Sequence, residues 1–491
     1  MSPQTFPQDK KWIALVLLSL AQFVVVLDAA IVNVALPSIG RELKFAQDDL
    51  SWVVNGYTLF FGGFLLLGGR LADLIGRRRM FVAGLILFAL ASLAGGLATS
   101  PGWLIAARAV QGLGAALLSP AALSLVTVMF SEGSERNKAL GVWGAVTGSG
   151  GAAGVLLGGV LTEYAGWEWV LFVNVPIGLA AAAIAPRLLP ESRNDGARNF
   201  DLAGAFSVTA GLSLLVYTIV DASNAGWLSG QTLGLAAVAL VLLAGFVAVE
   251  LRSKAPLVPF GIFRRRTITG TNVVGLLVAM ALFSMFFFIS LYMQQVLGYS
   301  AIKAGLSYLP LAVGIIVSAG IASSLVTRFG FKPILVTGLL LTAAGLVWFS
   351  QVDVDGSYLG DILFPSLLAA VGLGFAFVPM TIAAVSGVEA HESGLASGLI
   401  NTAQQVGGAL GLAILASIAN SRTDSIMESA RGAQSALPGA LTDGFQLAFI
   451  VGAGFAILGA ILASTLISSG ESRRHAAAAQ RGDVAPAPVP A

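Results

Sequence analysis

The sequence predicts an all-α integral membrane protein with about fourteen membrane-spanning helices. Apolar residues make up 56% of the 491 residues, charged residues make up only 11%, and the mean hydropathy is +0.86. A soluble domain carries far more charge than this. Apolar runs fill nearly the whole chain, and each approaches the roughly 20 residues that a helix needs to cross a membrane.

These runs follow one another with loops too short to fold as separate domains. They cover residues 12–36, 52–69, 80–99, 103–126, 139–162, 169–189, 202–220, 231–249, 268–293, 303–326, 333–351, 362–386, 394–418 and 444–468. The first run is too long for the apolar segment of a secretory signal peptide, so we interpret it as a membrane helix.

Lysine and arginine are distributed unevenly among the loops. With the N-terminus placed in the cytoplasm, nearly all of them fall in cytoplasmic segments; the outer-loop exceptions are Arg41, Lys44, Lys303, Arg422 and Arg431. The positive-inside rule therefore predicts a multi-pass protein of the plasma (cytoplasmic) membrane with both termini in the cytoplasm and an even number of helices.

Two charged residues, Asp28 and Arg108, lie inside predicted membrane helices. An ionised side chain at mid-helix costs about 3 kcal/mol even on lenient scales, so such residues usually have a function. The two helices run in opposite directions and place both residues at similar depths. One interpretation is that the pair only neutralises itself or that the side chains snorkel. The other is that one or both residues handle protons or substrate.

Glycine patterns recur along the chain. Offsets of 254, 257 and 260 residues pair Gly76 with Gly330, Gly141 with Gly398 and Gly112 with Gly372. Such a repeat predicts two six-helix halves with two further helices inserted between them. The expected organisation is a cytoplasmic N-terminus (residues 1–11), an N-terminal half (12–189), a linker with the inserted helices (190–250), a C-terminal half (251–468) and a disordered cytoplasmic tail (469–491).

Three segments combine charged, polar and small residues in compact motifs. Residues 69–79 read GRLADLIGRRR, residues 27–37 read LDAAIVNVALP, and residues 108–114 read RAVQGLG. Together they resemble the major facilitator superfamily, and within it the fourteen-helix drug:proton antiporter family of the EmrB/QacA type. The resemblance implies the major facilitator fold, proton coupling through Asp28 and Arg108, and a cytoplasmic gate formed by Gly69, Asp73, Gly76, Arg77 and Arg78.

A glycine-rich helix at residues 139–162 is similar to the antiporter motif of that family, although Gly151 and Val155 replace common prolines. Small residues four apart let helix backbones approach closely, so the packing role needs no proline. The residues expected to pack in this way are Gly144, Gly148, Gly150, Gly154, Gly158 and Gly159.

A substrate cavity is expected between the two halves near the middle of the membrane. The polar residues that we expect to line it are Asn33, Asn55, Tyr57, Gln111, Asn401 and Gln405. Hydrogen bonding between helices is an alternative role for each of them. Asp28 is the one acid expected within the membrane, and a substrate with two positive charges would need a second. We therefore expect hydrophobic substrates that are neutral or carry one positive charge.

Several function classes find no support in the sequence. The chain has no cysteine, and its histidines, His391 and His475, lie in a loop and in the tail, so we expect no metal site and no cofactor. Residues 69–79 lack the ending of a phosphate-binding loop, so neither nucleotide nor nucleic acid is an expected partner. The expected partners are a small-molecule substrate, protons and membrane lipid.

The function that this sequence predicts is export of hydrophobic small molecules, such as drugs or antibiotics, in exchange for protons. An uptake symporter of the same fold would explain the helices and the repeat equally well, and the glycine-rich helix favours export. A membrane-embedded enzyme would have only Glu389, His391 and Glu392 as a candidate cluster near the cytoplasmic face. We therefore expect a transporter and not an enzyme.

Overall fold

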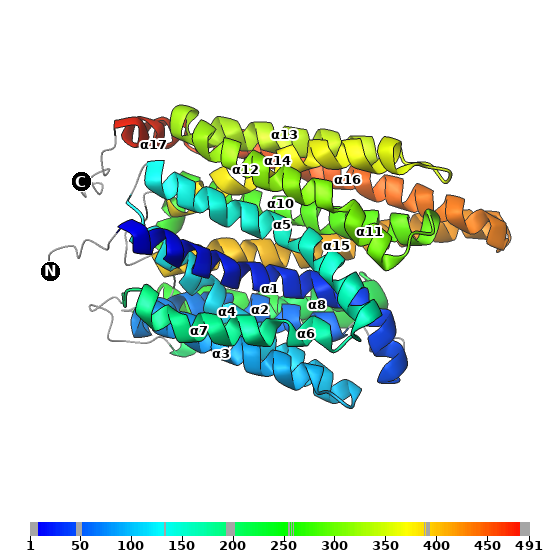
Figure 1. The fold of residues 1–491 in the computed structure, drawn as a ribbon, viewed down its shortest axis with the longest axis horizontal. Helices are drawn as coiled ribbons and strands as arrows, with labels where there is room; N and C mark the ends of the chain where they lie inside the picture. Colours follow the sequence, from blue (N-terminus) through cyan, green and yellow to red (C-terminus); the bar gives the residue numbers. More distant parts are fainter. Residues whose placement is uncertain are drawn as a thin grey trace.

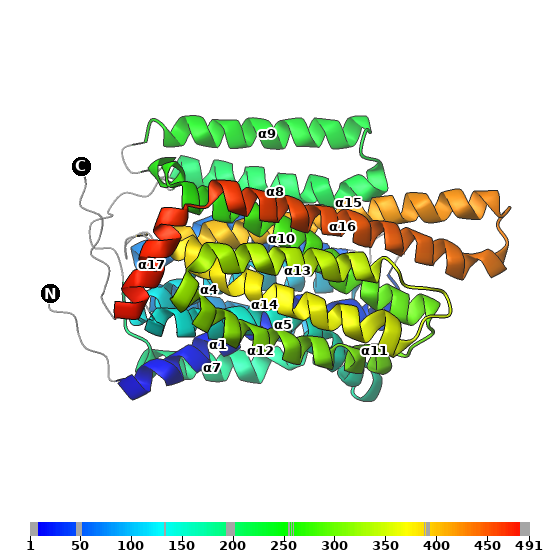
Figure 2. The same cartoon turned by 90° about the horizontal axis from the view of Figure 1, so that it is seen from above.

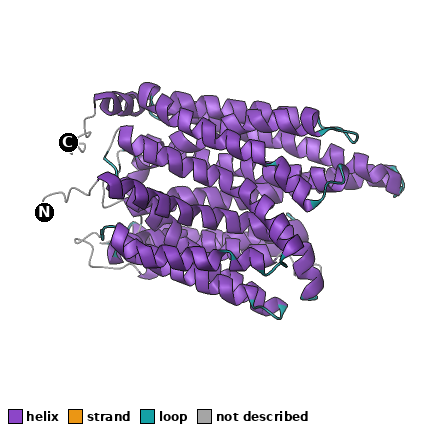
Figure 3. Cartoon of the chain, in the orientation of Figure 1, coloured by secondary structure: helices purple, strands orange, loops and turns teal. Residues whose placement is uncertain are grey.

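The computed structural model describes residues 8–45, 52–131, 134–192, 202–253, 256, 258, 260–386, 388 and 393–481. All regular structure in these residues is helical (Figure 3). The helices run roughly alongside one another, and the start of the first described helix lies at the same end of the bundle as the last described helix (Figure 1), an end which we call the terminal face.

The N-terminal half contains seven helical segments. They are α1 (Gln8–Glu42), α2 (Trp52–Ile75), α3 (Arg77–Gly96), α4 (Pro101–Met129), α5 (Ser134–Tyr164), α6 (Trp169–Phe172) and α7 (Asn174–Leu188). The break between α6 and α7 has a local cause. Pro176 has no N–H to donate to the carbonyl of Phe172, so the helical hydrogen-bond ladder is interrupted there.

Helices α8 (Leu202–Ala225) and α9 (Gly230–Glu250) connect the two halves, and α9 lies at the outside of the bundle (Figure 2). The C-terminal half also contains short 3-10 and π-helical turns. Its elements are η1 (Phe260–Arg264), α10 (Arg266–Leu291), η2 (Tyr292–Val296), α11 (Ala301–Ser307), α12 (Leu309–Phe329), α13 (Phe331–Phe349), η3 (Tyr358–Leu363), α14 (Phe364–Val385), α15 (Ser393–Ser429), η5 (Gln434–Ala436), α16 (Leu437–Leu466) and α17 (Ser469–Arg481).

Every predicted apolar run falls on one of these helices or on a consecutive pair. Among the described residues, 12 helices are long and apolar enough to cross a membrane, and the bent pair Ser134–Gly151 and Ala153–Tyr164, at 42°, would make a thirteenth. The apolar part of α8, Phe206–Ile219, is shorter. The helical membrane architecture is therefore confirmed, whereas a count of fourteen crossings stays a prediction.

The sequence repeat corresponds to repeated backbone geometry. Gly76 precedes α3 with φ 128°, and its partner Gly330 precedes α13 with φ 85°. Both values favour glycine, because a side chain is strained at positive φ. Helix α3 then crosses α4 at close range, since a Cβ on Gly84 of α3 would lie 2.9 Å from Gly114 O. Helix α13 crosses α14 equally closely, since a Cβ on Gly372 of α14 would lie 2.8 Å from Gly338 O. Small residues thus set equivalent helix crossings in both halves.

Helices α15 and α16 extend as a hairpin beyond the rest of the bundle, at the end opposite the terminal face (Figures 1 and 2). Both helices extend past the predicted apolar runs 394–418 and 444–468, because hydropathy falls where a helix enters water even if the helix continues. Packing supports the projecting part: the Thr423 hydroxyl donates to the carbonyl of Ala440 at 3.2 Å, beside Gly444.

The tail is helical over residues 469–481, which corrects the prediction of a disordered tail there; residues 482–491 lie outside the described part. The Ser468 hydroxyl caps α17 by accepting from the N–H of Glu471 at 3.3 Å, and an alanine run favours the helix. The Lys332 ammonium donates to the Ser469 hydroxyl at 2.8 Å, and His475 Nε2 lies 2.9 Å from Asn137 Oδ1. Helix α17 therefore contacts both halves at the terminal face.

We predict that the docking of α17 depends on pH through His475. Burial and, to a smaller extent, the nearby Arg136 charge together lower the pKa of His475 from 6.5 to about 4. Docking of α17 is therefore strongest above about pH 6.5 and weakens as the pH falls from there toward 4, because His475 takes up a proton more readily when α17 is undocked. Since the chain has no cysteine, single-cysteine labelling can report this.

The matched pair for this measurement is Ala476→Cys, at a buried position, and Ala477→Cys, at its exposed neighbour. The ratio of labelling at 476 to labelling at 477 cancels the pH dependence of thiol reactivity. This ratio should rise below about pH 6.5 and stay flat in a His475→Gln background. A ratio that is independent of pH with His475 present would contradict the prediction.

Candidate functional site

Asp28 of α1 and Arg108 of α4 form an ion pair inside the N-terminal half. Arg108 Nη1 donates to Asp28 Oδ2 at 2.6 Å. Asp28 is 0% exposed and Arg108 is 1% exposed, so water does not screen the pair. The two charges that stand out in the sequence are therefore direct partners.

The other carboxylate oxygen is bound by two side-chain amides. Gln111 Nε2 donates to Asp28 Oδ1 at 2.8 Å, and Asn174 Nδ2 donates to the same oxygen at 2.7 Å. The Ser92 hydroxyl accepts from Gln111 Nε2 at 2.6 Å. Asp28, Ser92, Arg108, Gln111 and Asn174 are all buried, and we call them the carboxylate network.

Arg108 is held by further contacts. Its Nε donates to the carbonyl of Val53 at 3.1 Å, its Nη1 also donates to Gln111 Oε1 at 2.5 Å, and its guanidinium lies 4.4 Å from the ring centroid of Tyr57. Its Nη2, however, is buried without a partner, as is Asn174 Oδ1. An unpaired buried polar group costs about 1–3 kcal/mol, so these two atoms mark a site that is not optimised for a single state.

A second buried ion pair lies where α2 ends at the terminal face. Arg77 donates to Asp73 Oδ1 from Nη2 at 2.8 Å and from Nε at 3.2 Å. Asp73 Oδ2 accepts from the N–H of Leu395 at 3.2 Å, in the first turn of α15. A carboxylate is favoured at the positive end of a helix. Asp73, Arg77 and Leu395 thus join the two halves, and we call them the latch.

The remaining residues of the predicted gate surround the latch. Gly69 is buried on α2, and Gly76 allows the turn into α3. Arg78 Nη1 donates to the carbonyls of Pro186 and Leu189 at 3.3 and 3.2 Å. These bonds tie the start of α3 to the end of α7.

Helix α5 packs against α1 through its glycines. A Cβ on Gly154 or Gly158 would lie 2.7 Å from the carbonyl oxygen of Leu27 or Ile31, respectively, and one on Gly150 would meet Val26. Gly144 faces Val378 of α14 instead. The other two predicted packing residues also lie in α5: Gly159 is buried, and nothing is described around Gly148.

We predict that Gly154→Ala destabilises the protein by about 1–3 kcal/mol, because its methyl group collides with backbone next to Asp28. Gly151→Ala is the matched control on the same helix, since its Cβ would meet nothing closer than Phe286 at 4.0 Å. Thermal unfolding in detergent should separate the two variants. Equal midpoints would show that the close contact between α1 and α5 is not needed for stability.

The six predicted cavity residues lie in different surroundings. Gln111 belongs to the carboxylate network, and the ring of Tyr57 packs against Arg108 while its hydroxyl donates to Val25 O at 3.3 Å. The others are half-buried or exposed: Asn33 is exposed and donates to Ala29 O, Asn401 donates to Ser397 O, Gln405 faces Gly62, and Asn55 is half-buried on α2. Tyr57, Gln111, Asn33 and Asn401 thus make the hydrogen bonds that were their alternative role, and cavity lining stays a prediction for all six residues.

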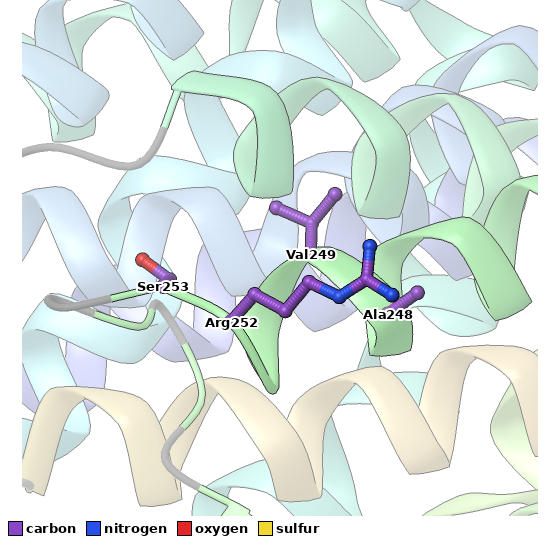
Figure 4. A pocket seen from close by; sticks show the side chains of 4 residues that line it. All are labelled: Ala248, Val249, Arg252 and Ser253. Atoms are coloured by element: carbon purple, nitrogen blue, oxygen red, sulfur yellow. The ribbon is translucent and has the colours of Figure 1, made fainter.

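One hollow of about 370 Å³ lies at the end of α9 (Figure 4) and is lined by Ala248, Val249, Arg252 and Ser253. Because α9 packs mainly on α8, this hollow is not the predicted substrate cavity. The candidate enzyme cluster of Glu389, His391 and Glu392 lies outside the described residues.

Sequence reasoning missed Ser92 and Asn174. The sequence feature that could have pointed to Asn174 is its position as a polar residue within the apolar run of residues 169–189, two positions before a proline. Uncharged polar residues are common in membrane helices, so only the structure could show that Ser92 and Asn174 are buried and that their side chains lie next to Asp28 and Gln111.

A bundle of apolar helices in two repeated halves, with a buried ion pair and a latch between the halves, defines a multi-pass membrane transporter. Residues 18–412 match the Major Facilitator Superfamily. The chain is 40% identical to the puromycin resistance protein pur8 of Streptomyces alboniger, over 94% of this chain and 92% of that one. It therefore belongs to the Major Facilitator Superfamily.

Two further comparisons agree with this membership. The cephamycin export protein CmcT of Amycolatopsis lactamdurans is 44% identical, over 84% of this chain and 85% of that one. The crystal structure of the human organic anion transporter MFSD10 superposes with a TM-score of 0.65 at 16% identity, over 93% of this chain and 100% of that one. That structure shares the fold.

Proposed function

We propose that this protein exports hydrophobic small molecules, of the antibiotic or drug type, across the cytoplasmic membrane in exchange for protons. The observation that carries the proposal is the carboxylate of Asp28, which is 0% exposed and bound by three N–H donors from two helices. The relatives described as resistance and export proteins support the direction of transport and the class of substrate.

In this proposal Asp28 binds one proton from outside and releases it inside, alternating with the substrate. A gradient of one pH unit supplies about 1.4 kcal/mol, and 100 mV supplies about 2.3 kcal/mol per charge. One proton per neutral solute would then support a gradient of several hundredfold. Arg108 competes with the proton for the carboxylate and so promotes its release.

The terminal face is cytoplasmic in this account, and the latch closes it. The pair of Asp73 and Arg77 and the bond to Leu395 must separate before the site can open toward the cytoplasm. Arg78 keeps α3 and α7 together as one unit during this movement. The glycines of α5 keep α1 and α5 in register.

We predict that Asp73→Asn favours the state open to the cytoplasm, because it removes the charge that binds Arg77 and the start of α15. Losing a charge-assisted hydrogen bond of about 1.5–3 kcal/mol would shift the two-state ratio by at least about tenfold. A single cysteine at Leu395 should become more reactive to a water-soluble thiol reagent in everted vesicles. Unchanged reactivity relative to native Asp73 would argue that the latch does not close this face.

The substrate class follows from the acids that are available. Among the described membrane helices Asp28 is the buried acid away from the terminal face, so one positive charge at most can be matched there. A bis-cationic dye should therefore be exported much less efficiently than a monocationic dye of similar size. Equal efficiency would contradict a site with one acid.

Transport by everted membrane vesicles tests the proposed direction. Energised vesicles that contain the native protein should accumulate a hydrophobic monocationic dye, and a protonophore should abolish the accumulation. Dye loss from energised vesicles, with accumulation in right-side-out vesicles instead, would identify an uptake symporter. The same assay in sodium-free buffer excludes sodium as the coupling ion.

A further inference from the structure

The hydrogen bonds around Asp28 fit only its ionised form. Oδ2 accepts from Arg108, and Oδ1 accepts from Gln111 and Asn174. All of these partners donate. If Asp28 takes up a proton, its new hydroxyl group needs an acceptor, because a buried hydroxyl without one is costly.

Two of the nearby oxygen atoms already accept hydrogen bonds. Gln111 Oε1 accepts from Arg108, and the Ser92 hydroxyl accepts from Gln111. The Tyr57 hydroxyl points elsewhere and donates to the carbonyl of Val25. Among the described charged and titratable groups, Arg108 contacts Asp28 and the Tyr57 ring packs on Arg108; the guanidinium has only donors, and the Tyr57 hydroxyl is engaged at Val25.

Asn174 Oδ1, in contrast, is buried with no partner. A half-turn of this amide about Cβ–Cγ exchanges its oxygen and nitrogen, and this torsion has a broad, roughly two-fold preference. The turn would bring Oδ1 to the position from which Nδ2 now donates to Asp28 Oδ1 at 2.7 Å. Gln111 is less free to turn, because both ends of its amide are bound.

We propose that Asn174 is a positioning residue that responds to the protonation of Asp28, donating to the carboxylate and, after its amide turns, accepting from the neutral carboxyl group. This inference rests on the proposed function. The step balances as one proton added to Asp28 Oδ1, the hydrogen bond between Asn174 and Asp28 reversed, and the 3.5 Å bond from Asn174 Nδ2 to the Ser92 hydroxyl given up. It gives the neutral acid a partner on α7 when its attraction to Arg108 on α4 is weakened.

Infrared difference spectra between acidic and alkaline pH test this on the full-length chain in lipid. The carboxyl C=O band of Asp28 is the band that is absent in Asp28→Asn. We expect a simultaneous change in an asparagine side-chain amide band, identified by its shift when asparagine is labelled with ¹³C. In Asn174→Leu the amide change should vanish, and the carboxyl band should move to higher frequency because it has lost a hydrogen-bond partner.

The matched control is Asn272→Leu. Asn272 on α10 also has a buried Oδ1 without a partner among the described residues, but its amide donates to the carbonyl of Ile268 on its own helix. This variant should keep both spectral changes. Drug–proton exchange should fall about tenfold or more in Asn174→Leu, remain near native in Asn272→Leu, and be partly restored in Asn174→Gln, which keeps the amide.

The outcomes separate the two proposals. A carboxyl band with no asparagine amide change in the native chain would overturn the role of Asn174 and leave Asp28 as the proton carrier; this result needs no variant to fold. A carboxyl band unmoved in Asn174→Leu would do the same. If no titrating band depends on Asp28, both the proposed function and this inference are wrong.

Discussion

Asp28→Asn is expected to reduce drug–proton exchange by at least about a hundredfold, the scale of losing a proton-transfer group. The amide has nearly the size of the carboxylate and still accepts from Arg108, but it does not bind a proton in the physiological pH range. Energised uptake of dye by everted vesicles measures the effect. Downhill leakage of the dye should be unchanged.

Asp221→Asn is the matched control for this substitution. Asp221 belongs to α8, where it accepts from Gln231 of α9 at 2.9 Å, and it takes no part in the carboxylate network. The same change of charge at this position should leave exchange near the native rate. If Asp28→Asn protein is present at native levels and still exchanges dye for protons normally, Asp28 does not carry the proton.

Arg108→Met is expected to lower the free energy of unfolding by about 3–5 kcal/mol at neutral pH, because it leaves the Asp28 charge buried without its cation. The loss should be smaller at low pH, where Asp28 can take up a proton and become neutral. Thermal and denaturant unfolding in detergent, at two pH values, would measure it. Equal stability of variant and native protein at both pH values would contradict a buried ion pair.

The double variant Asp28→Leu with Arg108→Met separates stability from function. Replacing both members of a buried pair with apolar residues is often neutral or stabilising. We therefore expect unfolding stability to recover while exchange stays abolished. Recovery of exchange in this variant would show that another group couples transport to protons.

The ion pair could be predicted from the sequence because a charge inside an apolar run is rare and costly. Asp28 and Arg108 are 80 positions apart, yet opposite helix directions placed them at similar depths. The family resemblance implied a cytoplasmic gate that includes Asp73 and Arg77, and these two residues form the second buried ion pair. Its partner Leu395 contributes only a backbone N–H, which no side-chain pattern reveals.

Uncharged polar residues were harder to place. Tyr57 and Gln111 were expected to line a cavity, and Asn174 was not identified, because the face that a membrane helix turns inward depends on its rotation within the bundle.

The extended ends of α15 and α16 and the helix α17 were missed for another reason. Hydropathy detects the membrane boundary, but a helix that is capped and packed continues past that boundary into water.

The proposed exchange of substrate for protons through Asp28 is tested most directly with purified protein in vesicles that contain a pH-sensitive dye and carry no imposed ion gradient. A substrate gradient alone should then drive protons in the opposite direction with the native chain and not with Asp28→Asn. Substrate movement without any proton movement in the native protein, at the same protein density, would contradict the account.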